Sequence, residues 1–224
     1  MAIAADLTLD RLRLALAPAV ADAVAFDGWT REAVASAAGA QQVDPAVAIL
    51  AFKGDDASLR PMALIAAWIE AVDSAMAARL PAAALAGVPI RERIRMLVET
   101  RLDAIAHQQE ALRRALAIMA APQNVPPALR FGWRSADAMW RLAGDTATDY
   151  NHYTKRATLA ALYASTLAVF AYDESDGHAA TSAFLARRID DVMRFEKTKA
   201  ALLRPREERF SPARLLGRLR YPVR

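Results

Sequence analysis

The sequence favours an all-α fold, and two observations lead to that expectation. Hydrophobic residues make up 55% of the 224-residue chain, and many of them are Ala, a strong helix former, whereas runs of β-branched residues that would supply strands are missing. Apolar residues also recur at helical spacing along most of the chain, interrupted by Pro and Gly. The length is sufficient to bury a core in one domain or two.

Apolar spacing and stop signals divide the chain into a series of expected helices. The first helix, over about 7–25, carries Leu9, Leu12, Leu16 and Val20 on one stripe. The second ends at Gly39, a common stop at a helix C-terminus. The second and later helices are expected over about 30–38, 45–52, 56–80, 90–120, 126–143, 149–172 and 178–203.

Capping residues mark two of these starts. Asp44 and Pro45 combine an N-cap with Pro at the first helical position. Thr148 or Asp149 suits the cap of the helix that follows. The long helix over 90–120 can bend at about 107–109, where three polar residues interrupt it.

Charge separates the C-terminal end from the rest of the chain. Seven Arg and two Glu lie within 204–224, so this tail has a net charge of +5. The whole chain has a net charge of +4, and the remainder therefore has a net charge of −1. We therefore expect three segments: a helix-turn-helix-like subdomain over 1–54, a helical ligand-binding domain over 55–203, and a basic amphipathic tail over 204–224.

Several classes of site are not supported by the residue inventory. The chain has no Cys, which excludes disulfides, thiolate zinc sites and Cys nucleophiles. Its histidines, His107, His152 and His178, do not form the paired E-x-x-H motifs of a di-iron bundle. No P-loop, nucleophile elbow or dinucleotide fingerprint occurs. We expect no catalytic residue, no metal site and no enzymatic activity.

The N-terminus does not resemble a targeting segment. Arg11 and Arg13 interrupt its apolar residues, so we expect no signal peptide. No uncharged apolar stretch of about 18 residues indicates a membrane span, and the nearest, 157–172, is shorter and rich in small residues. A cytoplasmic protein is expected.

The first three expected helices resemble the opening of TetR-type transcriptional regulators, from Gly28-Trp29-Thr30 through Gly39 and on to the long helix over 56–80. An ordinary three-helix subdomain is the other interpretation. A helix that reads DNA needs Lys or Arg for phosphates and polar side chains for base edges. The helix over 45–52 has neither, so we expect a degenerate helix-turn-helix and no specific nucleic-acid binding. A TetR-type regulator with a hydrophobic effector is the alternative function.

The most distinctive stretch runs from Trp140 to Arg156 and fills the pattern W-x-x-A-G-D-x-x-T-D-[FY]-N-x-Y-T-[KR]-R. Chemistry alone describes it as a helix end, a polar turn and a capped helix start. The stretch resembles the ubiquinone (coenzyme Q) biosynthesis accessory proteins that share the TetR-like fold. Further matches to this family are Gly28-Trp29-Thr30, Glu99-Thr100-Arg101-Leu102, Pro122-Gln123-Asn124-Val125-Pro126, Phe184-Leu185 and Arg188-Ile189-Asp190-Asp191.

The resemblance implies a TetR-like helical bundle with a C-terminal helical domain that binds an isoprenoid lipid or quinone and needs no other cofactor. It implies a homodimer that does not regulate transcription, that presents a quinone intermediate to demethoxyubiquinone hydroxylase, and that meets the inner face of the membrane peripherally. Members of the family often carry Trp where this chain has His152, which bears on the contact with the hydroxylase. The partner-binding residues carried over from the motif are Asp149, Tyr150, Asn151, His152, Tyr153 and Arg156.

A lipid cavity needs large, flexible apolar side chains on its walls. Core packing is the alternative role for each such residue, because Met and Leu fill gaps equally well. The opposite face of the helix over 149–172 is rich in Ala, which allows close helix approach or leaves space. The expected lipid-binding residues are Met96, Leu97, Leu116, Met119, Trp133, Met139, Trp140, Leu159, Leu162, Tyr163, Val169 and Phe170.

The tail has the pattern of a short basic amphipathic helix that starts at Ser211 and Pro212. Such a helix suits an anionic membrane surface, and each Arg near that surface contributes about 1 kcal/mol. A solvated tail, or one that pairs with an acidic protein surface, is the alternative. The expected membrane-binding residues are Phe210, Arg214, Leu215, Leu216, Arg218, Leu219 and Arg220.

Overall fold

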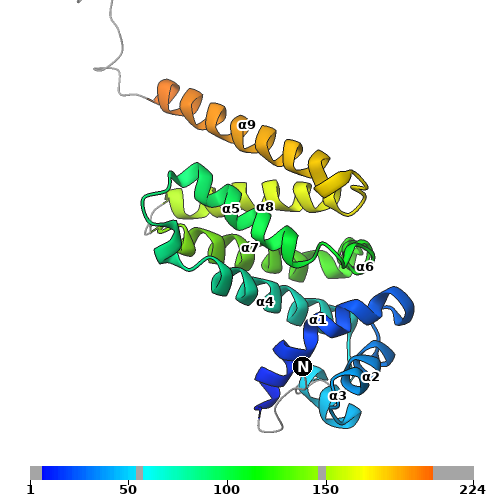
Figure 1. The fold of residues 1–224 in the computed structure, drawn as a ribbon. Coiled ribbons are helices and arrows are strands. Elements are labelled where there is room, and N and C mark those ends of the chain that lie inside the picture. Colours follow the sequence, from blue (N-terminus) through cyan, green and yellow to red (C-terminus); the bar gives the residue numbers. More distant parts are fainter. Residues whose placement is uncertain (1–6, 54–57, 146–149, 204–224) are drawn as a thin grey trace, which may run out of the picture. The chain divides into compact units, whose positions relative to one another are not determined.

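The computed structural model describes residues 7–53, 58–145 and 150–203, and within these ranges the regular elements are all helices. This confirms the expected all-α fold. The helices are α1 (Leu9–Asp27), α2 (Arg31–Ala40), α3 (Pro45–Lys53), α4 (Pro61–Arg79), α5 (Ile90–Ala104), α6 (Gln109–Met119), α7 (Val125–Leu142), α8 (Tyr150–Phe170) and α9 (Ala179–Leu203), with short 3-10 helices η1 (Ala82–Leu85), η2 (Pro122–Asn124) and η3 (Asp176–His178) (Figure 1).

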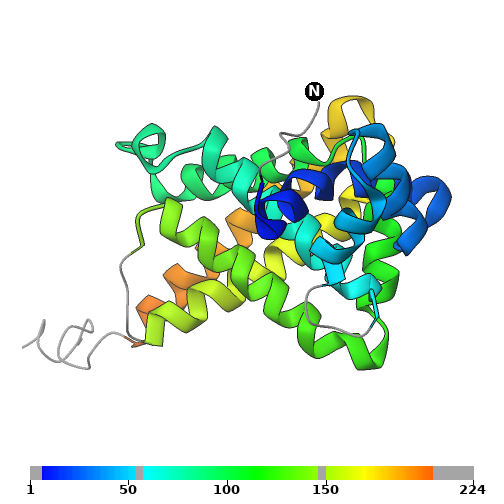
Figure 2. The ribbon, with the colours of Figure 1, turned by 90° about the horizontal axis from the view of Figure 1, so that it is seen from below.

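The N-terminal helices form a bundle beside the start of α4. Helix α1 packs against α2, α3 and α4, and the three helices gather near the N-terminal end of α4 (Figures 1 and 2). Leu12, Leu16 and Val20 of the expected stripe are buried, whereas Leu9 at the helix start is exposed. This arrangement matches the helix-turn-helix-like order expected from the sequence.

The start of α4 differs from the expectation of a helix beginning near residue 56. The helix begins at Pro61, and Arg60 before it is extended, with φ −104° and ψ 141°. Proline disfavours the α conformation for the residue that precedes it and is accepted in the first helical turn. The proline therefore sets where this helix starts.

The single long helix expected over 90–120 is two helices, α5 and α6. The break contains Gln108, which is buried. Its side-chain Oε1 accepts a hydrogen bond of 2.8 Å from Trp68 Nε1, and its Nε2 donates to Asp22 Oδ1 at 2.6 Å. Because α5 and α6 are separate helices, the side-chain amide of Gln108 lies between α4 and α1, where its oxygen and its nitrogen both have hydrogen-bond partners.

Among the described helices, α4 has the length and apolar composition of a membrane span. Its residues Leu64, Ile65 and Trp68 are buried, and the helix packs against α1, α5 and α7. This packing is typical of a core helix in a globular protein.

The described chain divides into two units, one up to residue 186 and one from residue 187, and α9 contributes residues to both. The first unit joins the expected segments 1–54 and 55–203 up to residue 186, since α1 packs on both α4 and α6. In the second unit, Asp191 pairs with Arg188 and Arg194 along one face of α9, at 2.7 and 3.7 Å. The expected tail helix over 204–224 lies outside the described residues.

Candidate ligand cavity

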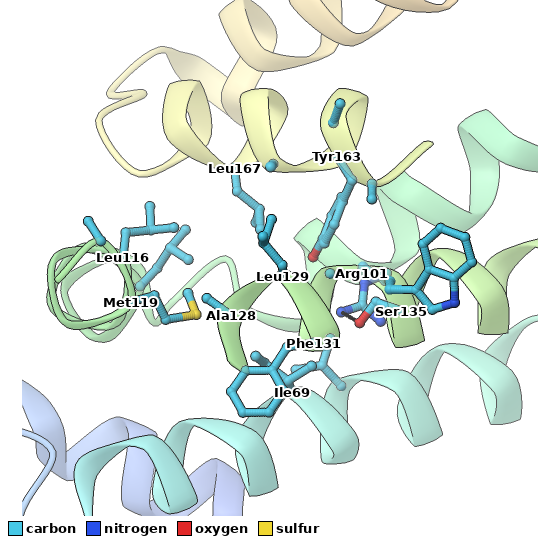
Figure 3. Close-up of a pocket in the computed structure, with 18 of the residues that line it drawn as sticks. Ile69, Arg101, Leu116, Met119, Ala128, Leu129, Phe131, Ser135, Tyr163 and Leu167 are labelled. Carbon is cyan, nitrogen blue, oxygen red and sulfur yellow. Dashed lines mark hydrogen bonds between the residues drawn. The ribbon is translucent and has the colours of Figure 1, made fainter. Parts of the chain in front are cut away.

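A cavity of about 560 Å³ lies inside the first unit, with walls from α4, α5, α6, α7 and α8. This volume is within the range of small-molecule binding sites. Ile69, Leu116, Met119, Leu129 and Leu167 form part of its apolar wall (Figure 3). Apolar surface of this kind binds hydrocarbon by removing it from water.

The Ala-rich face of α8 accounts for part of the space. Ala157, Ala160, Ala161 and Ala164 all line the cavity. The sequence left open whether this face allows close helix approach or leaves room, and the structure shows that it borders the cavity. Longer side chains at these positions would reduce the volume available to a ligand.

Several of the residues of α7 and α8 that line the cavity are also exposed to solvent. Two of its lining residues on α7, Val125 and Leu129, are 39% and 69% exposed. Ala161 and Ala164 on α8 line the cavity and are exposed as well. A ligand therefore has a route from solvent that passes apolar side chains.

One corner of the cavity is polar. Arg101 of α5 lines the wall and is only 2% exposed. Its guanidinium forms an ion pair with Asp73 of α4, donates to Ser135 Oγ at 3.3 Å, and lies 4.9 Å from the centre of the Tyr163 ring. Figure 3 shows the Tyr163 hydroxyl pointing toward Arg101 and Ser135, whereas Leu116 and Met119 lie at the other end.

Four of the twelve expected lipid-binding residues line this cavity: Leu116, Met119, Trp133 and Tyr163. Leu97 and Met139 are fully buried but do not border it, because their side chains lie within the packed core. The other six also lie away from the cavity wall: Met96, Trp140, Leu159, Leu162, Val169 and Phe170. Helical spacing identified apolar faces but could not distinguish a cavity wall from helix packing.

Arg101, Ser135 and Gly132 also line the cavity, and the apolar pattern of the sequence predicts none of them as a lining residue. Arg101 belongs to one of the short runs that carry the family resemblance, which was the only available signal. Its ion pair joins residues 28 positions apart, and its bond to Ser135 joins residues 34 apart. Such contacts depend on tertiary packing rather than on local sequence.

The corner between α7 and α8 is held by a buried arginine. Arg156 is 2% exposed, and its Nε and Nη1 lie 2.6 Å from Asp137 Oδ1 and 3.0 Å from Asp145 Oδ2. Burial lowers the pKa of Arg156, but the hydrogen bonds to Asp137 and Asp145 outweigh it and raise the pKa above its usual value. Lys155 adds a second pair to Asp145, at 2.7 Å.

This burial corrects the expectation that Arg156 contacts a partner directly. Its guanidinium is occupied by carboxylates of the same chain, so its role is to position the corner. Tyr153 is 62% exposed, and its ring lies 5.2 Å from the ring of His152 and 6.1 Å from that of Trp133. Asp149 and the side chains of Tyr150 and Asn151 lie outside the described residues.

Within the described residues, no group of three or more His, Asp or Glu side chains is arranged to hold a metal ion. The expected membrane-binding residues of the tail, 210–220, lie outside the described part of the chain. The cavity and the surface at Tyr153 are thus the features on which a function can be argued.

This chain is similar in sequence to ubiquinone biosynthesis proteins of the COQ9 family. The COQ9 family profile matches residues 125–196. The mitochondrial ubiquinone biosynthesis protein COQ9 of Rattus norvegicus is 34% identical over 174 residues, which cover 76% of this chain and 55% of that protein. The corresponding protein of Homo sapiens is 32% identical over 192 residues, covering 84% and 60%. The chain therefore spans little more than half the length of these relatives.

A solved structure agrees with the fold. The crystal structure of a TetR transcriptional regulator from Nitrosomonas europaea superposes with a TM-score of 0.63 and 24% identity, over 82% of this chain and 99% of that chain. This similarity confirms the TetR-like helical fold. At such identity it carries no information on function.

Proposed function

We propose that this chain, which belongs to the COQ9 family of ubiquinone biosynthesis proteins, has a non-catalytic role. In this role its cavity binds an isoprenoid quinone intermediate. In this role the protein presents the bound molecule to a membrane-associated hydroxylase that acts on demethoxyubiquinone. The relatives are named as biosynthesis proteins and not as enzymes. The proposed working form is a homodimer.

The observation that carries the proposal is the open apolar cavity of about 560 Å³ in the first unit. Empty apolar space is costly to a protein, because its lining side chains lose packing contacts. A hydrocarbon ligand would restore those contacts and would also gain the free energy of leaving water. The exposed side chains of Val125 and Leu129 supply an apolar entrance for the isoprenoid tail.

The surface around His152 and Tyr153 is the proposed contact for the hydroxylase. Tyr153 is an exposed aromatic residue, and aromatic residues are enriched at the energetic centres of protein interfaces. Its ring also neighbours Trp133, which lines the cavity, so one ring contact joins the surface to the ligand site. The buried Arg156 holds the α7–α8 corner that carries this surface.

The proposed membrane contact is the basic tail over 204–224, which places the protein peripherally on an anionic membrane. Its support is its sequence, with seven Arg and interspersed Leu. The named relatives are mitochondrial proteins. Attachment through such a short apolar face is expected to be weak and reversible, and it would be strengthened in a dimer.

The alternative, a TetR-type regulator, has the fold in its favour and the chemistry of α3 against it. The exposed side chains of α3 include Val47 and Leu50, and Lys53 at its end is its one cation. A helix of this composition offers neither phosphate contacts nor base readout. Nanomolar, sequence-specific binding to DNA at physiological salt would support the regulator instead.

Native mass spectrometry of protein purified from cells tests the proposed function. The spectrum should contain a species whose added mass matches a quinone or another isoprenoid lipid, released when the protein is unfolded. Collision-induced release then identifies the ligand by its mass. A protein that is consistently recovered without any bound lipid, and that takes none up from a cell extract, would refute lipid presentation.

A further inference from the structure

The polar corner of the cavity has an unusual hydrogen-bonding state. Only 2% of the surface of Arg101 is exposed, and its Nε has no hydrogen-bond partner among the described residues. The Tyr163 hydroxyl points toward Arg101 (Figure 3), whose guanidinium lies 4.9 Å from the centre of the Tyr163 ring. Buried polar groups are normally satisfied, and leaving one unsatisfied costs free energy.

We infer that Arg101, Ser135 and Tyr163 form the binding site for a neutral, hydrogen-bond-accepting head group of the ligand. This inference rests on the proposed function, because it assumes that the cavity binds an amphiphile. The unpartnered Nε–H of Arg101 and the Tyr163 hydroxyl supply two donors at one end of the cavity. A ring carbonyl oxygen placed there would satisfy both of them.

The charges on the cavity wall favour a neutral head group over an ionised one. Arg101 is the only charged residue on the described cavity wall, and its charge is already neutralised by Asp73. An anionic head group would therefore bring an uncompensated negative charge into an apolar site, which is strongly unfavourable. A cation would have no carboxylate on the wall to pair with. A carbonyl-bearing ring satisfies the donors without adding charge.

The arrangement also sets the orientation of the ligand. The apolar side chains of Leu116 and Met119 lie at the end of the cavity away from Arg101 (Figure 3). Because the entrance is lined by Val125 and Leu129, a tail longer than the cavity can leave along α7 while the ring stays at the buried Arg101. The head group is thus the part held most firmly.

Equilibrium dialysis with three matched ligands tests the inference: 2-hexyl-1,4-benzoquinone, hexylbenzene and 4-hexylbenzoate. The ligands share a ring and a tail and differ in the head group. The wild-type chain should bind the quinone about tenfold more tightly than hexylbenzene, the difference typical of a hydrogen bond from a charged donor. It should bind the benzoate more weakly than the quinone.

Two variants test whether Arg101 and Tyr163 cause the preference for the quinone. Arg101→Lys keeps a cation beside Asp73 but removes the Nε–H, and it should reduce the quinone preference about tenfold while hexylbenzene binds as before. Tyr163→Phe removes only the hydroxyl and should reduce it about threefold. Thr158→Ala, at an exposed position of α8 that does not line the cavity, is the control and should leave the preference unchanged. Tyr163→Phe decides the matter if Arg101→Lys does not fold.

The outcomes separate this inference from the proposed function. If the wild-type chain binds none of the three ligands, lipid binding itself is contradicted. If it binds hexylbenzene as tightly as the quinone, or the benzoate more tightly, the cavity binds hydrocarbon but the head-group site is wrong. An unchanged preference in folded Tyr163→Phe and Arg101→Lys would also overturn the inference.

Discussion

Arg156 illustrates how one buried side chain can organise a surface without being part of it. The motif that runs from Trp140 to Arg156 identifies the region. In the structure, Arg156 pairs with Asp145 of this motif and with Asp137, which precedes it on α7. Trp140 adds a hydrogen bond of 3.0 Å to the carbonyl oxygen of Lys155. These contacts tie the end of α7 to the start of α8, next to the exposed Tyr153.

Replacing Arg156 with Met should lower the free energy of unfolding by about 3 kcal/mol, since two carboxylates lose their buried partner. Urea denaturation followed by circular dichroism measures the change. Arg141→Met is the matched control, because Arg141 pairs with Asp137 at 2.6 Å but its side chain is 75% exposed. It should change stability by less than about 1 kcal/mol. Equal effects of the two variants would contradict the structural role of Arg156.

Asp173 gives a prediction on pH. Burial raises the pKa of this carboxyl, but hydrogen bonds from Ser175 and Thr181 outweigh it and hold the pKa well below its usual range. The Thr181 backbone N–H donates to Asp173 Oδ2 at 2.7 Å, so the carboxylate caps the start of α9. A lowered folded-state pKa means that the stabilisation is complete above the unfolded-state pKa and is lost as the pH falls below it.

Asp173→Asn should therefore destabilise the protein by about 2 kcal/mol at pH 7. The difference between wild type and variant should stay constant down to about pH 5 and shrink below about pH 4, as the wild-type carboxylate becomes protonated. Urea titrations at a series of pH values measure it. A difference that grows toward low pH would contradict this assignment.

The helices show which parts of the fold local sequence can predict. The start of α3 follows from Asp44, whose Oδ1 accepts a hydrogen bond of 2.8 Å from Ala46 N, and from Pro45. The division of α5 from α6 could not be predicted, because Gln108 breaks the helix to reach Trp68 and Asp22, which are 40 and 86 positions away. Nor could apolar spacing separate cavity wall from core, since Leu97 and Leu116 are both Leu at helical spacing, yet Leu97 is buried in the core and Leu116 lines the cavity. Local signals determine helix ends, whereas long-range contacts determine breaks and voids.

Helix α8 carries both the cavity wall and the proposed partner surface. Tyr153→Asp should weaken association with the hydroxylase by at least about tenfold, because a charge would replace an exposed aromatic anchor. Surface plasmon resonance with the purified hydroxylase measures it, together with a melting curve. Thr158→Asp, at another exposed position of α8, is the control and should bind as the wild type does. Unfolding of Tyr153→Asp, or equal loss in both variants, would point to a structural role for Tyr153.

The whole molecule combines the helices α1 to α9 with a strongly basic C-terminal segment. A chain lacking residues 204–224 loses seven Arg and a net charge of +5. We expect it to fold normally but no longer to sediment with vesicles of phosphatidylglycerol and phosphatidylcholine, since each Arg contributes about 1 kcal/mol near an anionic surface. The full-length chain should bind these vesicles and release them at high salt. Equal sedimentation of both chains would exclude the tail as the membrane contact.

The proposed function requires that lipid occupies the cavity, and substitutions at Gly132 test this with little disturbance of the fold. Gly132 lines the cavity, and a Cβ added there would meet no atom within 4 Å. Gly132→Ala should be tolerated and should stabilise α7 by up to about 1 kcal/mol. Gly132→Phe should place its ring in the space that the ligand would use.

The most direct measurement is the amount of isoprenoid lipid extracted per mole of protein from the wild type, Gly132→Ala and Gly132→Phe, each purified in the same way and shown to be folded. We predict comparable lipid in the wild type and Gly132→Ala and almost none in Gly132→Phe. Lipid at the same level in folded Gly132→Phe, or none in the wild type, would contradict a lipid-binding cavity.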